Sequence, residues 1–525
     1  MARLGLDFGT TNTVVVCSDR GRYPVVPHVV DTAIGQVIRE VFPSLLAYEH
    51  DSGRFLYGPE AERSLARPGA ERRYSVIRSI KRLLRDYGGG GRLASDVQPG
   101  GFDTAEVLTG FAAALRDSVR RSGLFPATEP LQAVLTWPAN ANGAQRHITR
   151  HCFKAAGFEV IGTLNEPTAA AIEFADRMVR GNRTAARRVA ATVAIFDFGG
   201  GTFDCSLVRI ASGNLTVIDA TGVAELGGDD LDHVLAQMFA RELERDLQAL
   251  SRVQRDQLLR HACQQKESIA SSSVRSLVLI PEDIGLRGHT CSVRVMDYFQ
   301  QLRPVIAPAI DSLSALLSGT AARQAQVAAV ELDAIYLVGG SSKLPLVAEM
   351  IAARFPATRI VMTDKPFTAT AMGAAIHSAE QLTLRDILSR HFGVLRLADD
   401  GCREFFAPIF LAGTRLPAAG SAPLQRRVEY SPRHNIGHLR YFECASVDDR
   451  GRPAAGVRPW SDVLFPYDPT IPIESKVAAG EIAVREDLAD DRICETYTCD
   501  SDGVIAVRLD RQRDGQSRQY EIFRN

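Results

Sequence analysis

The sequence lacks an excess of charge of either sign. Its 61 lysines and arginines face 62 aspartates and glutamates, for a formal net charge of −1. Binding to nucleic acid or to an anionic membrane surface draws on a basic excess that neutralises phosphates. We therefore expect neither nucleic acid nor a membrane among its partners, and we expect protein and nucleotide instead.

Long apolar runs and paired cysteines are also missing. No uninterrupted apolar stretch approaches the roughly 20 residues that a membrane-spanning helix needs, and glycines and Asp7 interrupt the N-terminal run before it could form a signal-peptide core. The nine cysteines include no close Cys-x-x-Cys pair, which favours reduced thiols over a metal site or a disulfide framework. These absences predict a soluble, cytoplasmic protein.

The chain changes character near its last quarter. At 525 residues, 45% of them apolar, it is too long for one compact domain. Strand patterns such as 133–136 alternate with helical patterns such as 144–156, which indicates an α/β class. From about His391 the pattern becomes short alternating runs broken by turn residues, which is typical of β structure. We expect an α/β domain at 1–381, a linker at 382–392 and a β-rich domain at 393–525.

An internal repeat lies within the first part. The stretches Asp7–Asn12 and Asp197–Asp204 both begin with Asp-Phe-Gly, and each joins two β-branched or apolar runs. Their separation is far too long for a solenoid repeat, so the pattern indicates a duplicated domain whose halves each begin with a glycine-turned hairpin. A third glycine turn, Gly339–Ser342, follows another apolar run.

These hairpins have the composition of a phosphate site. Glycine lets backbone N–H groups approach a polyphosphate closely, and hydroxyls or metal-bound water can handle the remaining charge. Asp7 and Asp197, facing one another from the two halves, could hold a hydrated Mg²⁺. The alternative is that the glycines only form turns and the aspartates only cap them, which explains one hairpin better than two. The phosphate-binding candidates are Gly9, Thr10, Thr11, Asn12, Gly199, Gly200, Gly201 and Thr202.

The motifs resemble the DnaK-type, seventy-kilodalton heat-shock chaperone family over residues 3 to about 380. The resemblance implies a duplicated, actin-like (ribonuclease H-like) fold with two lobes, which binds ATP or ADP with Mg²⁺ and hydrolyses ATP. The stretches that carry it are Asp7–Asn12, Asn165–Ala171, Asp197–Asp204, Leu226–Asp230, Val338–Ser341 and Met372–Ala375.

The resemblance also implies roles for single residues. Lys81 stands where the family's catalytic lysine orients the attacking water, and Glu166 and Thr202 stand beside the γ-phosphate. Together with Asp7 and Asp197 these form the expected catalytic set. Pro138 and Arg146 resemble the pair that transmits the nucleotide state to the second domain. The further nucleotide-binding positions are Gly227, Gly228, Lys266, Gly339, Gly340 and Ser341.

The sequence departs from the family in three places. Cys263, Glu267 and Ala270 replace the residues usually found around the base and ribose. The stretch Asp386–Arg390 keeps only two apolar side chains of the family's leucine-rich linker. Residues 391–525 resemble the peptide-binding β sandwich faintly, and too few residues follow for the helical lid, so we expect a divergent member with a truncated, lidless substrate-binding domain.

Three functions remain open at this stage. The leading hypothesis is an ATP-dependent, chaperone-like ATPase in which nucleotide state is coupled to binding of unfolded or extended protein segments, with a possible co-chaperone. The second is a non-catalytic ATP-sensing scaffold with a dedicated protein partner, which the altered adenosine helix favours. The third is a sugar or acetate kinase on the same duplicated fold.

Overall fold

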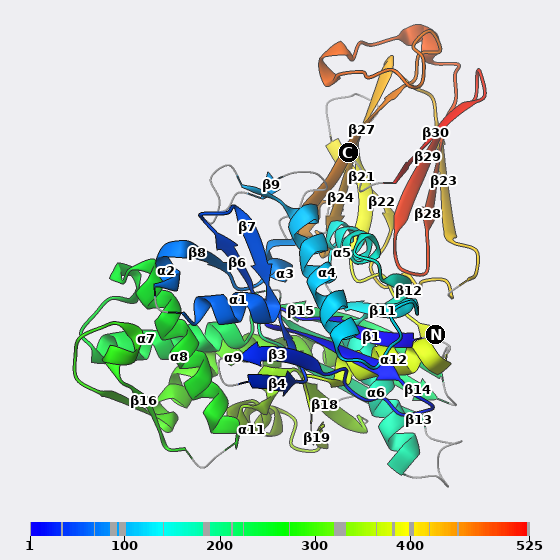
Figure 1. Cartoon of the computed structure of the whole chain (residues 1–525). Coiled ribbons are helices and arrows are strands. Elements are labelled where there is room, and N and C mark those ends of the chain that lie inside the picture. Colours follow the sequence, from blue (N-terminus) through cyan, green and yellow to red (C-terminus); the bar gives the residue numbers. More distant parts are fainter. Residues whose placement is uncertain are drawn as a thin grey trace. The chain divides into compact units, whose positions relative to one another are not determined.

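The computed structural model divides the chain into two compact units (Figure 1). The first comprises Met1–Arg82, Gly110–Asn140 and Ala156–Leu382, and the second comprises Leu83–Thr109, Ala141–Ala155 and Thr383–Asn525. The residues that the structure describes are 2–32, 35–67, 69–84, 92–93, 101–139, 141–181, 190–211, 214–223, 225–271, 274–319, 332–363, 365–380, 384–397, 404–418, 420–448 and 451–521.

The first unit contains a mixed sheet with the order β12-β11-β1-β2-β5. β1 pairs antiparallel with β2 and parallel with β11, and β11 pairs parallel with β12. The turn between β1 and β2 carries the first glycine motif, as the sequence predicts. The strands are β1 (Ala2–Phe8), β2 (Asn12–Ser18), β5 (Phe42–Pro43), β11 (Leu131–Trp137) and β12 (Glu159–Asn165).

A second sheet of the same unit repeats this plan. Within the unit its strands follow the order β19-β18-β13-β14-β15, with β13 antiparallel to β14 and parallel to β18. The two sheets therefore match strand for strand, and the expected α/β class is confirmed. The strands are β13 (Ala190–Phe198), β14 (Phe203–Ala211), β15 (Asn214–Val223), β18 (Ala334–Val338) and β19 (Ile360–Met362).

Helices α6 (Glu166–Gly181) and α12 (Ala369–Glu380) cross in close contact. A Cβ atom at Gly373 of α12 would lie 1.7 Å from the carbonyl oxygen of Ala169 of α6. Only glycine fits there, because any side chain would overlap backbone that cannot move aside. Glycine at position 373 thus has a packing reason within this chain, because the two backbones meet there without a side chain between them.

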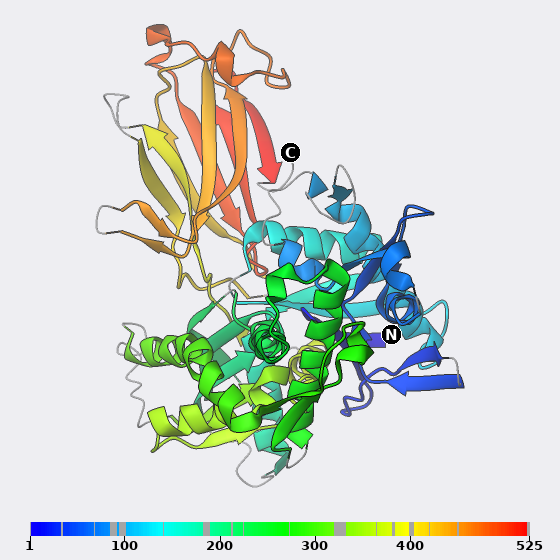
Figure 2. The same cartoon turned by 90° about the vertical axis from the view of Figure 1, so that its left-hand side faces the viewer.

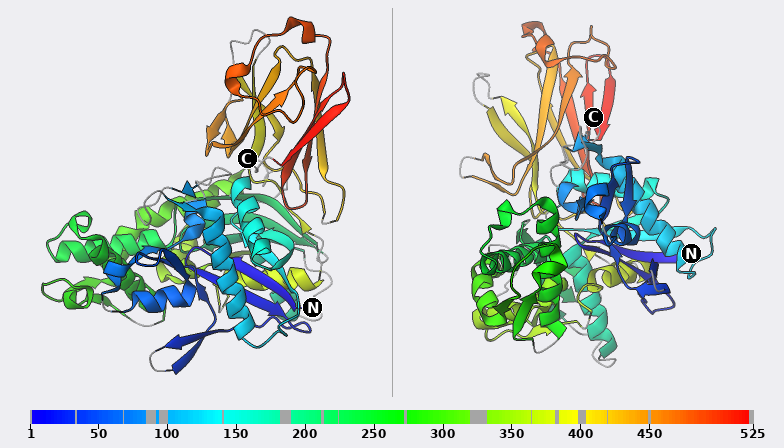
Figure 3. Two further views of the ribbon diagram at one scale, coloured as in Figure 1. Left: turned by 45° about the horizontal axis from the view of Figure 1, so that its top comes forward. Right: turned by 60° about the vertical axis from the view of Figure 1, so that its left-hand side comes forward.

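The remaining elements surround these sheets and helices. Figure 3 shows them from two further directions. The helices are α1 (Gly58–Leu65), α2 (Ala70–Arg73), α3 (Ile80–Leu83), α4 (Thr104–Arg121), α7 (Gly228–Glu242), α8 (Arg252–Ser271), α9 (Val295–Ser318) and α11 (Pro345–Arg354), and the strands are β3 (His28–Thr32), β4 (Gly35–Arg39), β6 (Leu46–Glu49), β7 (Arg54–Tyr57), β8 (Tyr74–Ile77), β16 (Ser276–Leu279) and β17 (Cys291–Arg294).

The second unit is built mainly of strands, in two four-stranded antiparallel sheets (Figure 2). Their orders are β22-β21-β24-β27 and β23-β28-β29-β30. The strands are β21 (His391–Leu397), β22 (Glu404–Phe410), β23 (Leu424–Tyr430), β24 (Ile436–Cys444), β27 (Arg458–Pro466), β28 (Ile493–Cys499), β29 (Ile505–Arg511) and β30 (Gln516–Glu521); β9 (Arg92–Leu93), β10 (Phe102–Asp103), α5 (Gly143–Ala155), β20 (Leu384–Arg385), β25 (Ser446–Val447) and β26 (Pro453–Ala455) complete it.

Polar side chains are buried between these sheets. Arg396 of β21 forms an ion pair with Glu495 of β28, whose side chain is fully buried. The Tyr497 hydroxyl donates to Glu495 Oε2 over 2.7 Å. Burial disfavours the charged guanidinium, yet Glu495 outweighs it and raises the pKa of Arg396. The sandwich therefore contains a charged pair next to its apolar core.

The linker stretch has a defined place in this unit. Ile387 and Leu388, its two apolar residues, are both buried, and Leu388 belongs to the core of the sandwich. Positions 382 and 383 of the expected linker lie outside the described residues. Within the described part of the chain, eight cysteines are free thiols.

Candidate functional site

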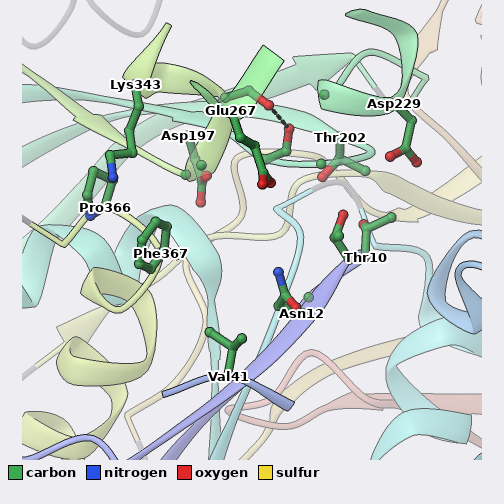
Figure 4. Close-up of a pocket in the computed structure, with 18 of the residues that line it drawn as sticks. Thr10, Asn12, Val41, Asp197, Thr202, Asp229, Glu267, Lys343, Pro366 and Phe367 are labelled. Carbon is green, nitrogen blue, oxygen red and sulfur yellow. Dashed lines mark hydrogen bonds between the residues drawn. The ribbon is translucent and has the colours of Figure 1, made fainter. Parts of the chain in front are cut away.

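The first unit encloses a cavity of about 470 Å³, a size typical of small-molecule sites (Figure 4). Its walls come from the two glycine hairpins, from helices α3, α6, α7 and α8, and from the turns that follow β18 and precede α12. The sequence-predicted residues that line it are Asp7, Gly9, Thr10, Thr11, Asn12, Lys81, Glu166, Asp197, Gly199, Gly200, Thr202, Gly228, Lys266, Gly339, Gly340 and Ser341.

The two hairpin turns lie against one another at this cavity. A Cβ atom at Gly200 would lie 2.1 Å from Thr11 Oγ1. Ser44 fixes the first turn, since its hydroxyl donates to Gly9 O over 2.8 Å and its amide donates to Thr11 O over 2.9 Å. The repeat thus brings its two turns, far apart in the sequence, to one site.

Gly201 and Gly227 lie behind the lining. A Cβ atom at Gly201 would meet Thr10 Cγ2 at 2.5 Å, and one at Gly227 would meet the backbone of Gly200 at 2.5 Å. Both glycines therefore allow close packing of the turns, and neither is among the lining residues.

A lysine and several carboxylates share the inner end of the cavity. Lys81 Nζ lies 2.5 Å from Glu166 Oε1, with each side chain 9% exposed. Thr136 Oγ1 donates to Asp7 Oδ1 over 3.1 Å. Asp197 is also buried. One ammonium group therefore balances a cluster of at least three acidic side chains.

The pKa values reflect this imbalance. Burial and the neighbouring Glu166 raise the pKa of Asp7 to about 7, although Lys81 and Thr136 act in the opposite direction. Burial, Glu166 and Asp7 likewise raise the pKa of Asp197 well above its usual range. Burial alone would lower the pKa of Lys81, but the negative charges of Glu166 and Asp7 outweigh the effect of burial and raise that pKa. The site therefore favours an added positive charge.

A hydrated divalent cation fits this donor set. No three His, Cys, Asp or Glu side chains converge on one metal position within the described parts of the chain. Mg²⁺ keeps several of its waters and commonly uses only one or two carboxylates. Asp7 and Asp197, both repelled by neighbouring acids and both lining the cavity, suit that mode of binding.

The third glycine turn packs onto the second hairpin. Gly339 has a φ of 82°, and a Cβ atom there would lie 2.4 Å from Phe198 O. Ser341 Oγ donates to Gly199 O over 2.8 Å. Lys266 of α8 pairs with Asp232 at 2.7 Å and donates to Gly228 O over 2.8 Å. This end of the cavity is thus held by contacts within the protein.

Further lining residues were not predicted. Cys263 and Glu267 were noted in the sequence only as departures, and Lys343 follows the third turn directly. Phe367 carries no periodic or motif signal. The additional side chains include Val41, Asp229, Asp232, Cys263, Glu267, Lys343, Pro366 and Phe367.

Pro138 and Arg146 are not among the lining residues. Pro138 follows β11 in the first unit. Arg146 lies on α5 in the second unit, where its side chain is buried and its guanidinium donates to Ala141 O over 3.1 Å and to Ser389 Oγ over 3.3 Å. Burial lowers the pKa of Arg146, while Glu443 acts in the opposite direction.

Comparison with known proteins identifies the family. The family model for the Hsp70 protein matches residues 102–394, more than half of the chain. The chain belongs to the Hsp70 family. This confirms the resemblance found in the sequence.

None of the helices described in the structure is long and apolar enough to cross a membrane.

Several Hsp70 relatives are similar over much of this chain. A chaperone protein HscA homolog of Tolumonas auensis is 30% identical over 443 residues, which cover 79% of this chain and 64% of that protein. The chaperone protein HscA of Shigella boydii is 31% identical over 395 residues, 71% of this chain and 57% of that protein. The stromal 70 kDa heat shock-related protein of Pisum sativum is 27% identical over 392 residues, which cover 71% of this chain and 52% of that protein. The chain thus spans less than two thirds of these relatives.

Proposed function

We propose that the first unit binds ATP with Mg²⁺ and hydrolyses it to ADP and inorganic phosphate. The observation that carries the proposal is one cavity lined by both acidic hairpins, next to the buried pair of Lys81 and Glu166. The strand-for-strand match of the two sheets supports an actin-like arrangement of two related lobes around that cavity.

Each group has a role that follows from its charge and position. The glycine turns and the hydroxyls of Thr10, Thr11 and Thr202 would hold the phosphates, and Asp7 and Asp197 would hold Mg²⁺ through water. When bound, Mg²⁺ supplies positive charge that offsets the charge on the phosphate oxygens. Phosphoryl transfer is catalysed mainly by positioning and electrostatics, and the nearby ammonium group can supply both.

Lys81 is proposed to orient the attacking water. Its ammonium group stays protonated because the neighbouring acids raise its pKa, so it can donate to the water oxygen while Glu166 fixes its direction. The water oxygen bonds to the γ-phosphorus as the bond to the bridging oxygen breaks, and the proton lost by the water passes to the released phosphate, so the products are ADP and inorganic phosphate. Glu166 contacts Lys81 directly, which makes it a positioning residue in this scheme.

We further propose that nucleotide state is coupled to protein binding by the second unit, in the cytoplasm. Membership of the Hsp70 family supports this, as does the burial of linker residue Leu388 in the core of the sandwich. The Arg146 guanidinium donates a hydrogen bond to Ser389 of the same linker. A change in the position of the linker would therefore displace the Arg146 side chain on α5. The partners would be unfolded or extended protein segments, with a possible co-chaperone.

A single-turnover hydrolysis assay tests the ATPase proposal. Lys81→Ala should lower the rate by on the order of 10²-fold to 10³-fold, while Lys154→Ala, at the end of α5, should leave it unchanged. An unchanged rate in Lys81→Ala would contradict the role of that lysine. Transfer of the phosphate to an added sugar or acetate, rather than its release into solution, would instead support the function of a sugar or acetate kinase.

The second candidate function is an ATP-sensing scaffold without catalysis. The observation that favours it is the presence of Cys263 and Glu267 in the cavity wall, where the family usually has other residues around the base and ribose. ATP binding without hydrolysis in the unmodified protein would select this function.

A further inference from the structure

One aromatic ring in the cavity wall is exposed. Phe367 keeps 38% of its surface accessible, whereas Phe8 and Phe198, next to the hairpin aspartates, are buried. Leaving an apolar ring in contact with water loses the free energy that burial would supply. A ring that stays exposed and faces a cavity is therefore a candidate ligand contact.

The ring occupies the end of the cavity away from the hairpin hydroxyls. Figure 4 shows Phe367, Pro366 and Lys343 together on one side, and Thr10 and Thr202 on the other. The walls thus separate a polar end, with glycine turns and hydroxyls, from an end with an aromatic face. A nucleotide has the same division between its phosphates and its base.

The local backbone holds the ring in place. Pro366 is buried, and its carbonyl oxygen accepts from Gly339 N over 3.1 Å. The amide of Thr368 donates to Lys365 O over 3.0 Å. Lys343 Nζ lies 4.9 Å from the centre of the Phe367 ring, a cation–π distance. These contacts position the ring before any ligand arrives, which reduces the ordering cost of binding.

A carboxylate from α8 also lies in the cavity wall. Glu267 of α8 lines the cavity and extends into it (Figure 4). The family residues usually found around the base are replaced at Cys263 and Glu267, which leaves the base in need of another contact.

Resting on the proposed function, we infer that Phe367 is the stacking platform for the nucleobase of a bound purine nucleotide. Stacking on an aromatic side chain is favourable for any base, and by alanine substitution it corresponds to roughly 10-fold to 100-fold in affinity. Lys343 acts as a positioning residue, because its ammonium group covers part of the ring and limits where the base can lie.

The test is the dissociation constant of Mg·ATP, measured by titration calorimetry on the full chain. Phe367→Ala and Phe367→Leu should raise it by about 10-fold to 100-fold, and Phe367→Trp should keep it within about threefold of the unmodified protein. The matched control is Phe405→Ala, because Phe405 is similarly exposed at 41% but lies in the second unit. Single-turnover hydrolysis at saturating ATP should be unchanged in Phe405→Ala, and in the Phe367 variants its rate should fall by a smaller factor than the affinity, since the reacting end is untouched.

Two kinds of result would overturn the inference. Equal affinity of Phe367→Leu and the unmodified protein would show that an aromatic ring is not required, even if Phe367→Ala folds poorly. A loss of hydrolysis at saturation as large as the loss of affinity would show a general structural role. No ATP binding by the unmodified protein would instead overturn the proposed function, and the inference with it.

Discussion

Lys81 Nζ lies 2.5 Å from Glu166 Oε1, and both side chains are buried. The two residues are 85 positions apart in the sequence, and they come from different helices, α3 and α6. A buried charge is tolerated only when it is paired. The pair therefore fixes the position of the ammonium group at the inner end of the cavity.

We predict that Glu166→Gln lowers hydrolysis without abolishing ATP binding. The variant keeps the shape of the side chain but removes the charge that raises the pKa of Lys81 and that of Asp7. The rate should fall by roughly 10-fold to 100-fold, measured in single turnover. Glu159→Gln, an exposed residue of β12, provides the control. A rate equal to that of the unmodified protein would rule out positioning by Glu166.

Stability should depend on pH through Asp7. Its pKa is about 7 in the folded protein, against 3.8 for an unperturbed aspartate, so the folded state binds the proton more tightly. Stability contributed by the protonated form is therefore lost as pH rises from about 4 to above 7. The difference corresponds to an upper bound of roughly 4 kcal/mol. In the absence of Mg²⁺, thermal unfolding should shift to lower temperature between pH 5 and pH 8.

Asp7→Asn should remove much of that pH dependence and should be the more stable protein at pH 8. Asp51→Asn, at an exposed aspartate, should unfold like the unmodified protein at each pH. The prediction fails if the Asp7 variant retains the full pH dependence.

We predict that Gly373→Ala destabilises the first unit. The added Cβ would lie 1.7 Å from Ala169 O, which is backbone and cannot rotate away. Overpacking of this kind costs about 3 kcal/mol or more in unfolding free energy. Gly162→Ala is the matched control, because its Cβ would find Val134 Cγ2 at a comfortable 3.8 Å. Denaturant unfolding should show a large shift for the first variant and almost none for the second.

Glu495→Ala should destabilise the second unit. It would leave Arg396, which is 19% exposed, without its counter-charge, and removal of one partner of a buried pair costs up to about 3–5 kcal/mol. Asp510→Asn breaks the exposed pair with Arg508 on β29 and should cost less than about 1 kcal/mol. Similar destabilisation by both substitutions would contradict a special role for the buried pair.

Much of the first unit could be predicted because its signals are local. The two Asp-Phe-Gly turns predict the β1–β2 and β13–β14 hairpins, and their repetition predicts two related sheets. Lys81 is different, since a basic helical stretch gives no reason to expect a buried lysine. Only the family resemblance singled it out, and the structure now brings it into the cavity; its role stays a prediction.

The features that could not be predicted depend on distant parts of the chain. Phe367 faces the cavity because of a turn tied to Gly339, which no periodicity marks. Arg396 and Glu495 are 99 positions apart and belong to opposite sheets. Their pairing depends on how the two sheets stack, and a single sequence does not specify that register.

The crossing of α6 and α12 has one more consequence. Where helices interlock through side chains, a change in their angle forces many rotamers to rearrange together. At Gly373 the two main chains touch directly, with nothing interdigitated at the point of contact. Fewer side chains would therefore have to rearrange at this point if the angle between the two helices changed.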